Sequence, residues 1–203
     1  MKSISFIPVV LMLAATFSSA QAPADRTLRF QLMSGSAITI AGSSTVNSFR
    51  CTSNYVQGFG TVSSFAGSLE KAEVVVELAA QVTLFDCGNG RMNRDLWSAL
   101  KSDTHPLITY RLDEAIVEVS RITDADSISI QAAGKLTIAG VERPINLVLS
   151  AVKQADGMYI VTGQQDITMS EFEVDRPTAL LGLVKAHDDL TIYFDLKSTV
   201  MQF

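Results

Sequence analysis

Residues 134–149 read GKLTIAGVERPINLVL, and this stretch decides the class of fold. Apolar residues alternate with polar ones on both sides of a break at residues 140–144. This pattern is typical of two antiparallel strands that share one apolar face. Gly140 can supply a positive φ at the turn, and Pro144 is expected to open the second strand, where its missing N–H matters least. Because a hairpin alone is marginal in water, its apolar face must pack on more sheet.

Most of the remaining chain has the same alternation. Extended segments are expected at residues 55–65, 67–84, 107–119, 127–139, 144–153, 158–169 and 189–200. Residues 28–33 and 37–41 are expected to form a first hairpin around Ser34 and Gly35, with residues 42–48 as a polar connector. Antiparallel strands joined by short turns either close into a barrel or pack as a sandwich.

One segment departs from the strand pattern. Residues 93–101 predict a short helix, with Asn93 as its N-cap. Leu96, Trp97 and Leu100 would form its apolar face and cover the sheet or plug one end of it. The sequence has no internal repeat and no linker, so we expect one domain over residues 27–200.

Composition excludes several classes of function. The 203 residues are 47% hydrophobic and 18% charged, which is a composition typical of folded chains. The formal net charge is -5, and no cluster of Lys and Arg occurs. Binding to nucleic acid or to an anionic membrane surface is therefore not expected.

Residues 1–22 read MKSISFIPVVLMLAATFSSAQA and have the pattern of a cleaved secretory signal peptide. Small residues allow cleavage after Ala20 or after Ala22, and an uncleaved anchor is the alternative. No Cys follows either site, which argues against a lipoprotein anchor. We therefore expect a soluble protein in the periplasm or secreted.

Export changes the interpretation of the two cysteines, Cys51 and Cys87. An oxidising compartment favours a structural disulfide, which would close a loop of 36 residues (87 − 51). Such a loop contributes about 3–4 kcal/mol in the chain-entropy model. The alternative is a redox pair, but the C-x-x-C spacing is absent.

Residues 134–149 resemble the most characteristic segment of the YceI family. Similar, weaker matches follow the family's order, at residues 65–69 (FAGSL), 91–110, 167–174 (ITMSEFEV) and 188–196. The resemblance runs from about residue 28 to residue 200, and the chain departs from the family at the two cysteines and around residues 42–51. It implies an all-β protein with one short helix, folded as a lipocalin-like antiparallel barrel of about eight strands. It also implies an apolar lumen that holds a polyisoprenoid or a similar lipid tail.

The binding hypothesis depends on which side chains face the lumen. If the closing strand turns its apolar face inward, six side chains are expected to line the ligand: Leu147, Leu149, Leu190, Ile192, Phe194 and Leu196. The alternative is that the same side chains only fill a core. Sequence alone does not separate the two.

No catalytic constellation is present, and we expect no enzyme activity, no cofactor and no metal. The motifs G-x-S-x-G and H-E-x-x-H and a phosphate-binding loop are absent. His187, with Asp188 and Asp189 after it and Glu171 or Glu173 nearby, could form half of a metal site. The favoured interpretation is a polar turn before the last strand.

A membrane-spanning barrel is also disfavoured, because the face shared with Phe203 would carry Asp195 and Lys197 toward lipid. The sequence thus predicts an exported lipid-binding protein, as a monomer or weak dimer. The alternative is a non-catalytic periplasmic structural or stress-related protein with a filled barrel that acts through protein contacts.

Overall fold

The computed structural model describes residues 26–65, 68–122, 125–179 and 183–202. The expected signal peptide, residues 1–22, lies outside the described residues. In chain order the elements are β1 (Arg26–Leu32), β2 (Ala37–Ser44), β3 (Ser48–Ser53), β4 (Val56–Phe65), β5 (Ser68–Gln81), η1 (Val82–Leu84), α1 (Gly90–Ala99), β6 (Leu107–Ile122), β7 (Ala125–Ile138), β8 (Val141–Lys153), β9 (Tyr159–Thr168), η2 (Ser170–Phe172), β10 (Thr178–Ala179) and β11 (Val184–Gln202).

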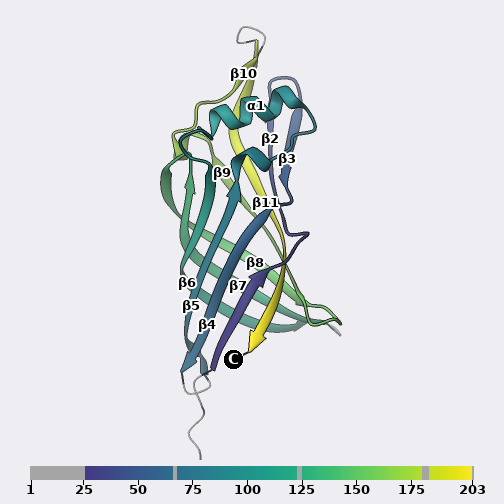
Figure 1. Ribbon diagram of the computed structural model, residues 1–203, viewed down its shortest axis with the longest axis vertical. Helices are drawn as coiled ribbons and strands as arrows, with labels where there is room; N and C mark the ends of the chain where they lie inside the picture. Colours follow the sequence, from purple (N-terminus) through teal and green to yellow (C-terminus); the bar gives the residue numbers. More distant parts are fainter. Residues whose placement is uncertain (1–25, 66–67, 123–124, 180–182, 203) are drawn as a thin grey trace, which may run out of the picture.

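Strands close into an antiparallel barrel of eight (Figure 1). Neighbours follow the order β1, β4, β5, β6, β7, β8, β9 and β11, and β11 returns to β1 with Phe30 opposite Val200. Closure pairs the edges that an open sheet would expose. The predicted all-β fold with one short helix is confirmed, and the structure selects the barrel over the sandwich.

The first predicted hairpin, residues 28–33 with 37–41, is wrong. β1 and β2 do not pair with each other; both pair antiparallel with β11, one after the other along its length. The hydroxyl of Ser36 explains the geometry, because it donates to the Met33 carbonyl at 2.8 Å and accepts from Lys197 N at 2.9 Å. These bonds pin a local kink against β11, so the chain continues in its original direction instead of reversing.

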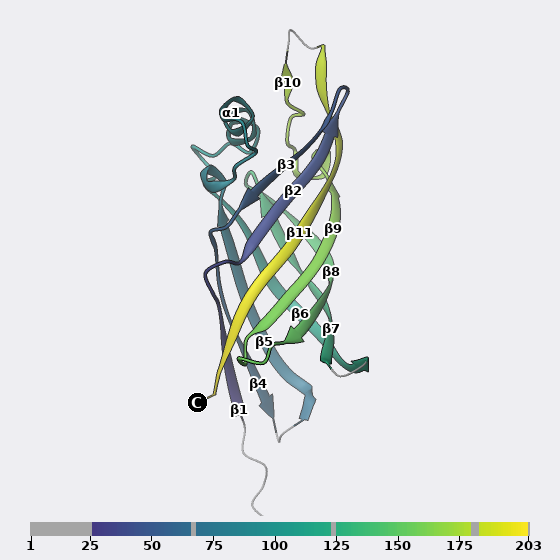
Figure 2. The same cartoon turned by 90° about the vertical axis from the view of Figure 1, so that its right-hand side faces the viewer.

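β2 and β3 instead form a hairpin of their own, where residues 42–48 were expected to be a connector. Ser43 pairs with Ser48, and the turn is closed by a hydrogen bond of 2.7 Å from Ser44 N to Asn47 O. The hairpin lies beside the upper part of β11 and extends the barrel wall there (Figure 2). The segment therefore contains the end of β2, a tight turn at residues 45–47 and the first residue of β3.

The hairpin of residues 134–149 is confirmed as β7 and β8. Its turn is Ala139 and Gly140, with φ of 50° and 82°. Two positive φ values are what a two-residue hairpin turn requires. β8 begins at Val141, so Pro144 lies inside the strand and does not open it. The strand tolerates this proline because β8 pairs with β9 only from Leu149 onward, which leaves the edge at Pro144 without a partner strand.

The helix α1 is present, but its start was misjudged. Asn89 is the N-cap, and its side-chain oxygen accepts from Arg91 N and Met92 N. Asn93 lies inside the helix, where its side chain accepts from Cys87 N at 2.8 Å and donates to Asp86 Oδ1 at 3.1 Å. Asn93 therefore links the helix by hydrogen bonds to the connector that precedes it, residues 85–89.

Candidate ligand-binding site

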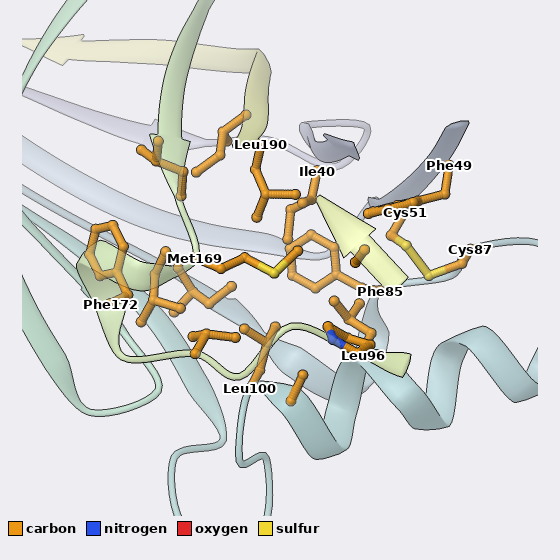
Figure 3. A pocket seen from close by; sticks show the side chains of 18 of the residues that line it. Ile40, Phe49, Cys51, Phe85, Cys87, Leu96, Leu100, Met169, Phe172 and Leu190 are labelled. Atoms are coloured by element: carbon orange, nitrogen blue, oxygen red, sulfur yellow. A yellow bond between two sulfur atoms is a disulfide. The ribbon is translucent and has the colours of Figure 1, made fainter. Parts of the chain in front are cut away.

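An apolar cavity of about 320 Å³ lies at the end of the barrel that carries α1. Its wall is assembled from the ends of strands and from the pieces between them, as Figure 3 shows. Representative lining residues are Ile40 of β2, Phe85, Leu96 of α1, Met169 and Leu190 of β11. A concave apolar site of this size can hold a small ligand or one lipid chain.

The cavity occupies only the upper part of the lumen. On β7 only Leu136 and Ile138 line it, and no described residue of β1, β4 or β8 does. Below it the lumen contains packed side chains of one core cluster, among them Leu112, Ala132 and Leu147. The cavity therefore lies at one end of the described barrel, and Leu112, Ala132 and Leu147 are buried beyond it.

The structure divides the six predicted lining residues into two groups. Leu190, Ile192 and Phe194 of β11 line the cavity. The other three are not among its lining residues: Leu147 is 4% exposed, Leu196 is 5% exposed, and Leu149 packs against the core cluster. The alternation of the sequence identifies the inner face of each strand but not the height of a residue along the barrel.

Sequence reasoning missed lining residues that lie outside the long strands. Phe85 follows η1, while Met169 and Phe172 lie at the start and the end of the η2 turn. No strand or helix period marks these positions. The resemblance of residues 167–174 (ITMSEFEV) to the family was the available signal for Met169 and Phe172, and Phe85 had none. Leu96 and Leu100 also line the cavity, and the apolar face of the predicted helix was the signal for both.

The disulfide between Cys51 and Cys87 is confirmed, and both cysteines line the cavity (Figure 3). Beside it, Thr52 and Asp86 exchange two backbone hydrogen bonds of 2.9 Å. Together these links join β3 to the connector that leads into α1. They close the wall where no strand continues the sheet.

Asp86 also organises this connector with its carboxylate. The Asn93 amide and the Gly88 N–H both donate to it, and these hydrogen bonds lower the pKa of Asp86 below its usual value. The carboxylate therefore stays ionised at neutral pH and continues to accept both bonds.

Tyr110 of β6 is the buried polar side chain of the cavity wall. It is 8% exposed, and its hydroxyl has no hydrogen-bond partner among the described residues. Burial raises the pKa of Tyr110 to about 12, with a further contribution from the nearby charge of Asp113. The side chain is therefore neutral at physiological pH and adds no charge to the site.

The polar residues of the cavity wall are few and mostly uncharged. They are Ser44, Asn47, Asp95, Thr109, Thr168, Thr178 and Tyr110. Among the described lining residues none is Lys, Arg or His. The wall is thus built for apolar groups, and it offers hydrogen bonds without a positive charge.

The residues weighed for a metal site have other partners. The His187 ring lies 2.9 Å from the Ser43 hydroxyl, and Asp188 accepts from Ser170 N at 3.1 Å. Glu171 accepts from Thr168 N at 2.8 Å, and Glu173 pairs with Arg143. Within the described part of the chain, no group of three or more His, Cys, Asp or Glu side chains could hold a metal ion.

The barrel and its apolar end cavity define a lipocalin-like β-barrel protein. The model of the YceI-like domain family matches residues 22–198, and the chain belongs to this family. None of the described helices has the length and apolar character needed to cross a membrane.

Two solved structures share the fold. The chain is similar to BcnA of Burkholderia cenocepacia, with 17% identity, a TM-score of 0.60 and coverage of 80% of this chain and 95% of that one. It is also similar to a polyisoprenoid binding domain from Saccharophagus degradans, with 13% identity, a TM-score of 0.61 and coverage of 85% and 98%. A comparison with curated proteins finds no match.

Proposed function

We propose that this protein is exported and binds the apolar chain of a lipid, isoprenoid or similar, in the cavity beneath α1, without covalent chemistry. The observation that carries the proposal is the cavity of about 320 Å³ with its apolar wall. Each methylene buried there contributes about 0.8 kcal/mol, so a chain can bind without a charged anchor. Leu190, Ile192 and Phe194 would contact it directly.

The family and the compartment support the proposal. One structural neighbour is described as a polyisoprenoid binding domain. The disulfide between Cys51 and Cys87 suits an oxidising compartment, which fits the signal-peptide pattern and a periplasmic or secreted location. We expect a monomer or weak dimer, which size-exclusion chromatography with light scattering would measure.

A cavity-filling substitution tests the function. Ala99 of α1 lines the cavity, whereas the next residue back, Ser98, is exposed. Ala99→Phe should reduce the lipid that co-purifies with protein from its host by at least about tenfold, because the ring displaces several methylenes. Ser98→Phe adds the same ring toward solvent and should leave the bound lipid unchanged.

Native mass spectrometry and organic extraction of the three proteins give the readout. Loss of lipid in Ala99→Phe alone supports the proposal. Absence of any lipid from the wild type, together with no binding of added chains, would overturn it. Equal loading of all three proteins would place the lipid outside the cavity and would also overturn it.

A second candidate function is a non-catalytic role through protein contacts. Two exposed aromatic side chains favour it. Phe59 on β4 is 57% exposed, and Tyr55, just before β4, is 68% exposed. Phe59→Lys should abolish such contacts while lipid loading stays at the wild-type level. An unchanged partner profile in Phe59→Lys would argue against this candidate.

A further inference from the structure

We propose that the α1 end of the barrel docks on an uncharged lipid leaflet through the tips of two hairpins, and that cargo passes there between the leaflet and the cavity. This inference rests on the proposed function and names the partner of the same site. Two exposed aliphatic side chains, Val46 and Leu183, carry it through their position beside the cavity.

The two hairpin tips form one joined protrusion. Val46 lies in the turn between β2 and β3, and Leu183 comes directly before β11. Thr45 joins the tips, because its backbone N–H donates to the Lys185 carbonyl at 3.0 Å and its hydroxyl donates to the Leu183 carbonyl at 3.4 Å. Figures 1 and 2 show both hairpins at the α1 end of the barrel, with β10 and the start of β11 reaching beyond α1. A flat surface that approaches this end therefore meets these tips.

Both side chains present apolar area to the solvent. Leu183 is 79% exposed, more than any other large hydrophobic side chain of the described residues, and Val46 is 68% exposed. A single exposed aliphatic side chain is common on protein surfaces and needs no explanation. Here two of them lie on tips that are hydrogen-bonded to each other, so an apolar layer would bury both in one contact.

The apolar surface continues from the tips into the cavity. Val46 also lines the cavity, and so do Val184, the residue after Leu183, and Phe49 of β3. A chain that leaves a leaflet at Val46 therefore stays in contact with apolar side chains until it is inside. A chain that crossed water instead would be slowed about fourfold for each exposed methylene.

The charge of the tips indicates which kind of surface they meet. Residues 44–47 carry no charge, and within residues 183–186 the charged side chain is Lys185. A lysine at this position can keep its stem in an apolar layer while its ammonium reaches the lipid phosphates. The whole chain has a net charge of -5, so it has no general attraction to anionic lipid. A protein partner would also cover two aliphatic side chains, but the proposed cargo dissolves in a membrane and not in water, which favours the leaflet.

The test measures how fast a bound chain moves from the protein to vesicles. Mature protein loaded with tritiated 1-hexadecanol is mixed with an excess of phosphatidylcholine vesicles, and the tracer in each fraction is counted after rapid separation. If docking delivers the chain, the transfer rate rises with vesicle concentration, because each encounter is an opportunity for delivery. If the chain leaves through water, its release from the protein limits the rate, and vesicle concentration has no effect.

A matched pair of substitutions locates the contact. Leu183→Asp should slow transfer at least about tenfold, because the leucine is no longer buried and a carboxylate must approach the leaflet. Leu183 is not among the lining residues, so binding of dissolved 1-decanol should stay at the wild-type level. Val148→Asp places the same charge on the outer face of β8, at a side chain that is 65% exposed, and should leave transfer unchanged. Raising the salt from about 0.05 M to about 0.5 M should change the wild-type rate less than about twofold, because the contact is apolar.

The outcomes separate this inference from the function beneath it. If the wild type binds no 1-decanol, the proposed function fails and the inference fails with it. If 1-decanol binds but transfer does not depend on vesicle concentration, lipid binding stands and docking is overturned. Wild-type transfer in Leu183→Asp, or equal slowing in Val148→Asp, would show that the tips are not the contact and would overturn it. A wild-type dimer that Leu183→Asp separates would assign the tips to a second copy of the chain, with the same consequence.

Discussion

The upper and lower parts of the barrel lumen have the same alternating strands but opposite contents. Around Leu190 the inner face borders empty space, whereas around Leu147 it is packed. The lower wall is made of continuous strands, and Leu112, Ala132 and Leu147 are buried on three neighbouring ones. The upper wall is pieced together from the β2–β3 hairpin, a connector, α1 and the η2 turn, and these pieces stand back and leave a cavity. A binding site in this fold is therefore determined by what interrupts the strands.

Glycine on the inner face helps to fill the lower part. A Cβ at Gly60 of β4 would lie 2.0 Å from the Phe30 ring of β1, its partner across the ladder. The missing side chain gives the ring room to lie over the strand. At this pair a large side chain thus covers a small one within the sheet.

The largest expected effect concerns the link that completes the upper wall. The double substitution Cys51→Ala and Cys87→Ala should lower the free energy of unfolding by about 3–4 kcal/mol, because it frees a loop of 36 residues. Urea unfolding of oxidised wild type, reduced wild type and variant would measure it. Reduced wild type and the variant should be equally stable, and a variant as stable as oxidised wild type would show that the upper wall needs no covalent link.

The second prediction compares one leucine from each region. Leu147→Ala should destabilise by about 3 kcal/mol, because the packed surroundings cannot collapse onto the void. Leu190→Ala should cost about 1 kcal/mol, because that side chain already borders a cavity and loses few contacts. Denaturant midpoints with unchanged slopes would give both values. Equal losses would erase the distinction between the two parts of the lumen.

Tyr110 lies at the boundary between the two parts and provides a pH-dependent test. Its pKa of about 12 in the fold exceeds the unfolded value of 10.0, so the unfolded chain loses the proton first as the pH rises. The stability that this group contributes is complete below pH 10 and is lost as the pH rises toward 12.

Tyr110→Phe removes this pH dependence and the buried hydroxyl that has no partner. Between pH 9 and pH 11.5 the wild type should lose about 1–2 kcal/mol more stability than the variant. At pH 7 the variant should be at least as stable as the wild type. Parallel pH curves for the two proteins would show that the hydroxyl is solvated.

The smallest effect concerns the start of the helix above the cavity. Asn89→Ala removes the side chain that accepts from Arg91 N and Met92 N, and it should cost about 1 kcal/mol. Ser98→Ala on the exposed face of α1 should change stability by less than about 0.5 kcal/mol. Thermal unfolding of both variants would measure the difference. An equal loss in both would mean that Asn89 does not act as the cap.

The sequence predicted the long strands of the barrel and the disulfide, because those follow from period and from compartment, but it did not predict β3. Ile192 and Leu147 were both assigned to the inner face, and both are buried there. Their different environments could not be predicted, because the height of a residue depends on how registers accumulate around the closed wall. The choice of barrel over sandwich came from the family resemblance and not from the alternation. The cap was misplaced because Asn89 and Asn93 are both reasonable starts, and only the tertiary contacts of Asn93 with the connector distinguish them.

The seam of the barrel joins its first strand to its last, with Leu28 opposite Gln202 and Leu32 opposite Ser198. Before residues 198–202 are synthesised, no partner exists for that edge of β1, however well the rest has formed. The cylinder is therefore completed only when residues 198–202 pair with β1. Until then the chain carries an unpaired edge that could add a strand from another molecule. A chaperone that shields this edge of β1 would protect the chain until the seam closes.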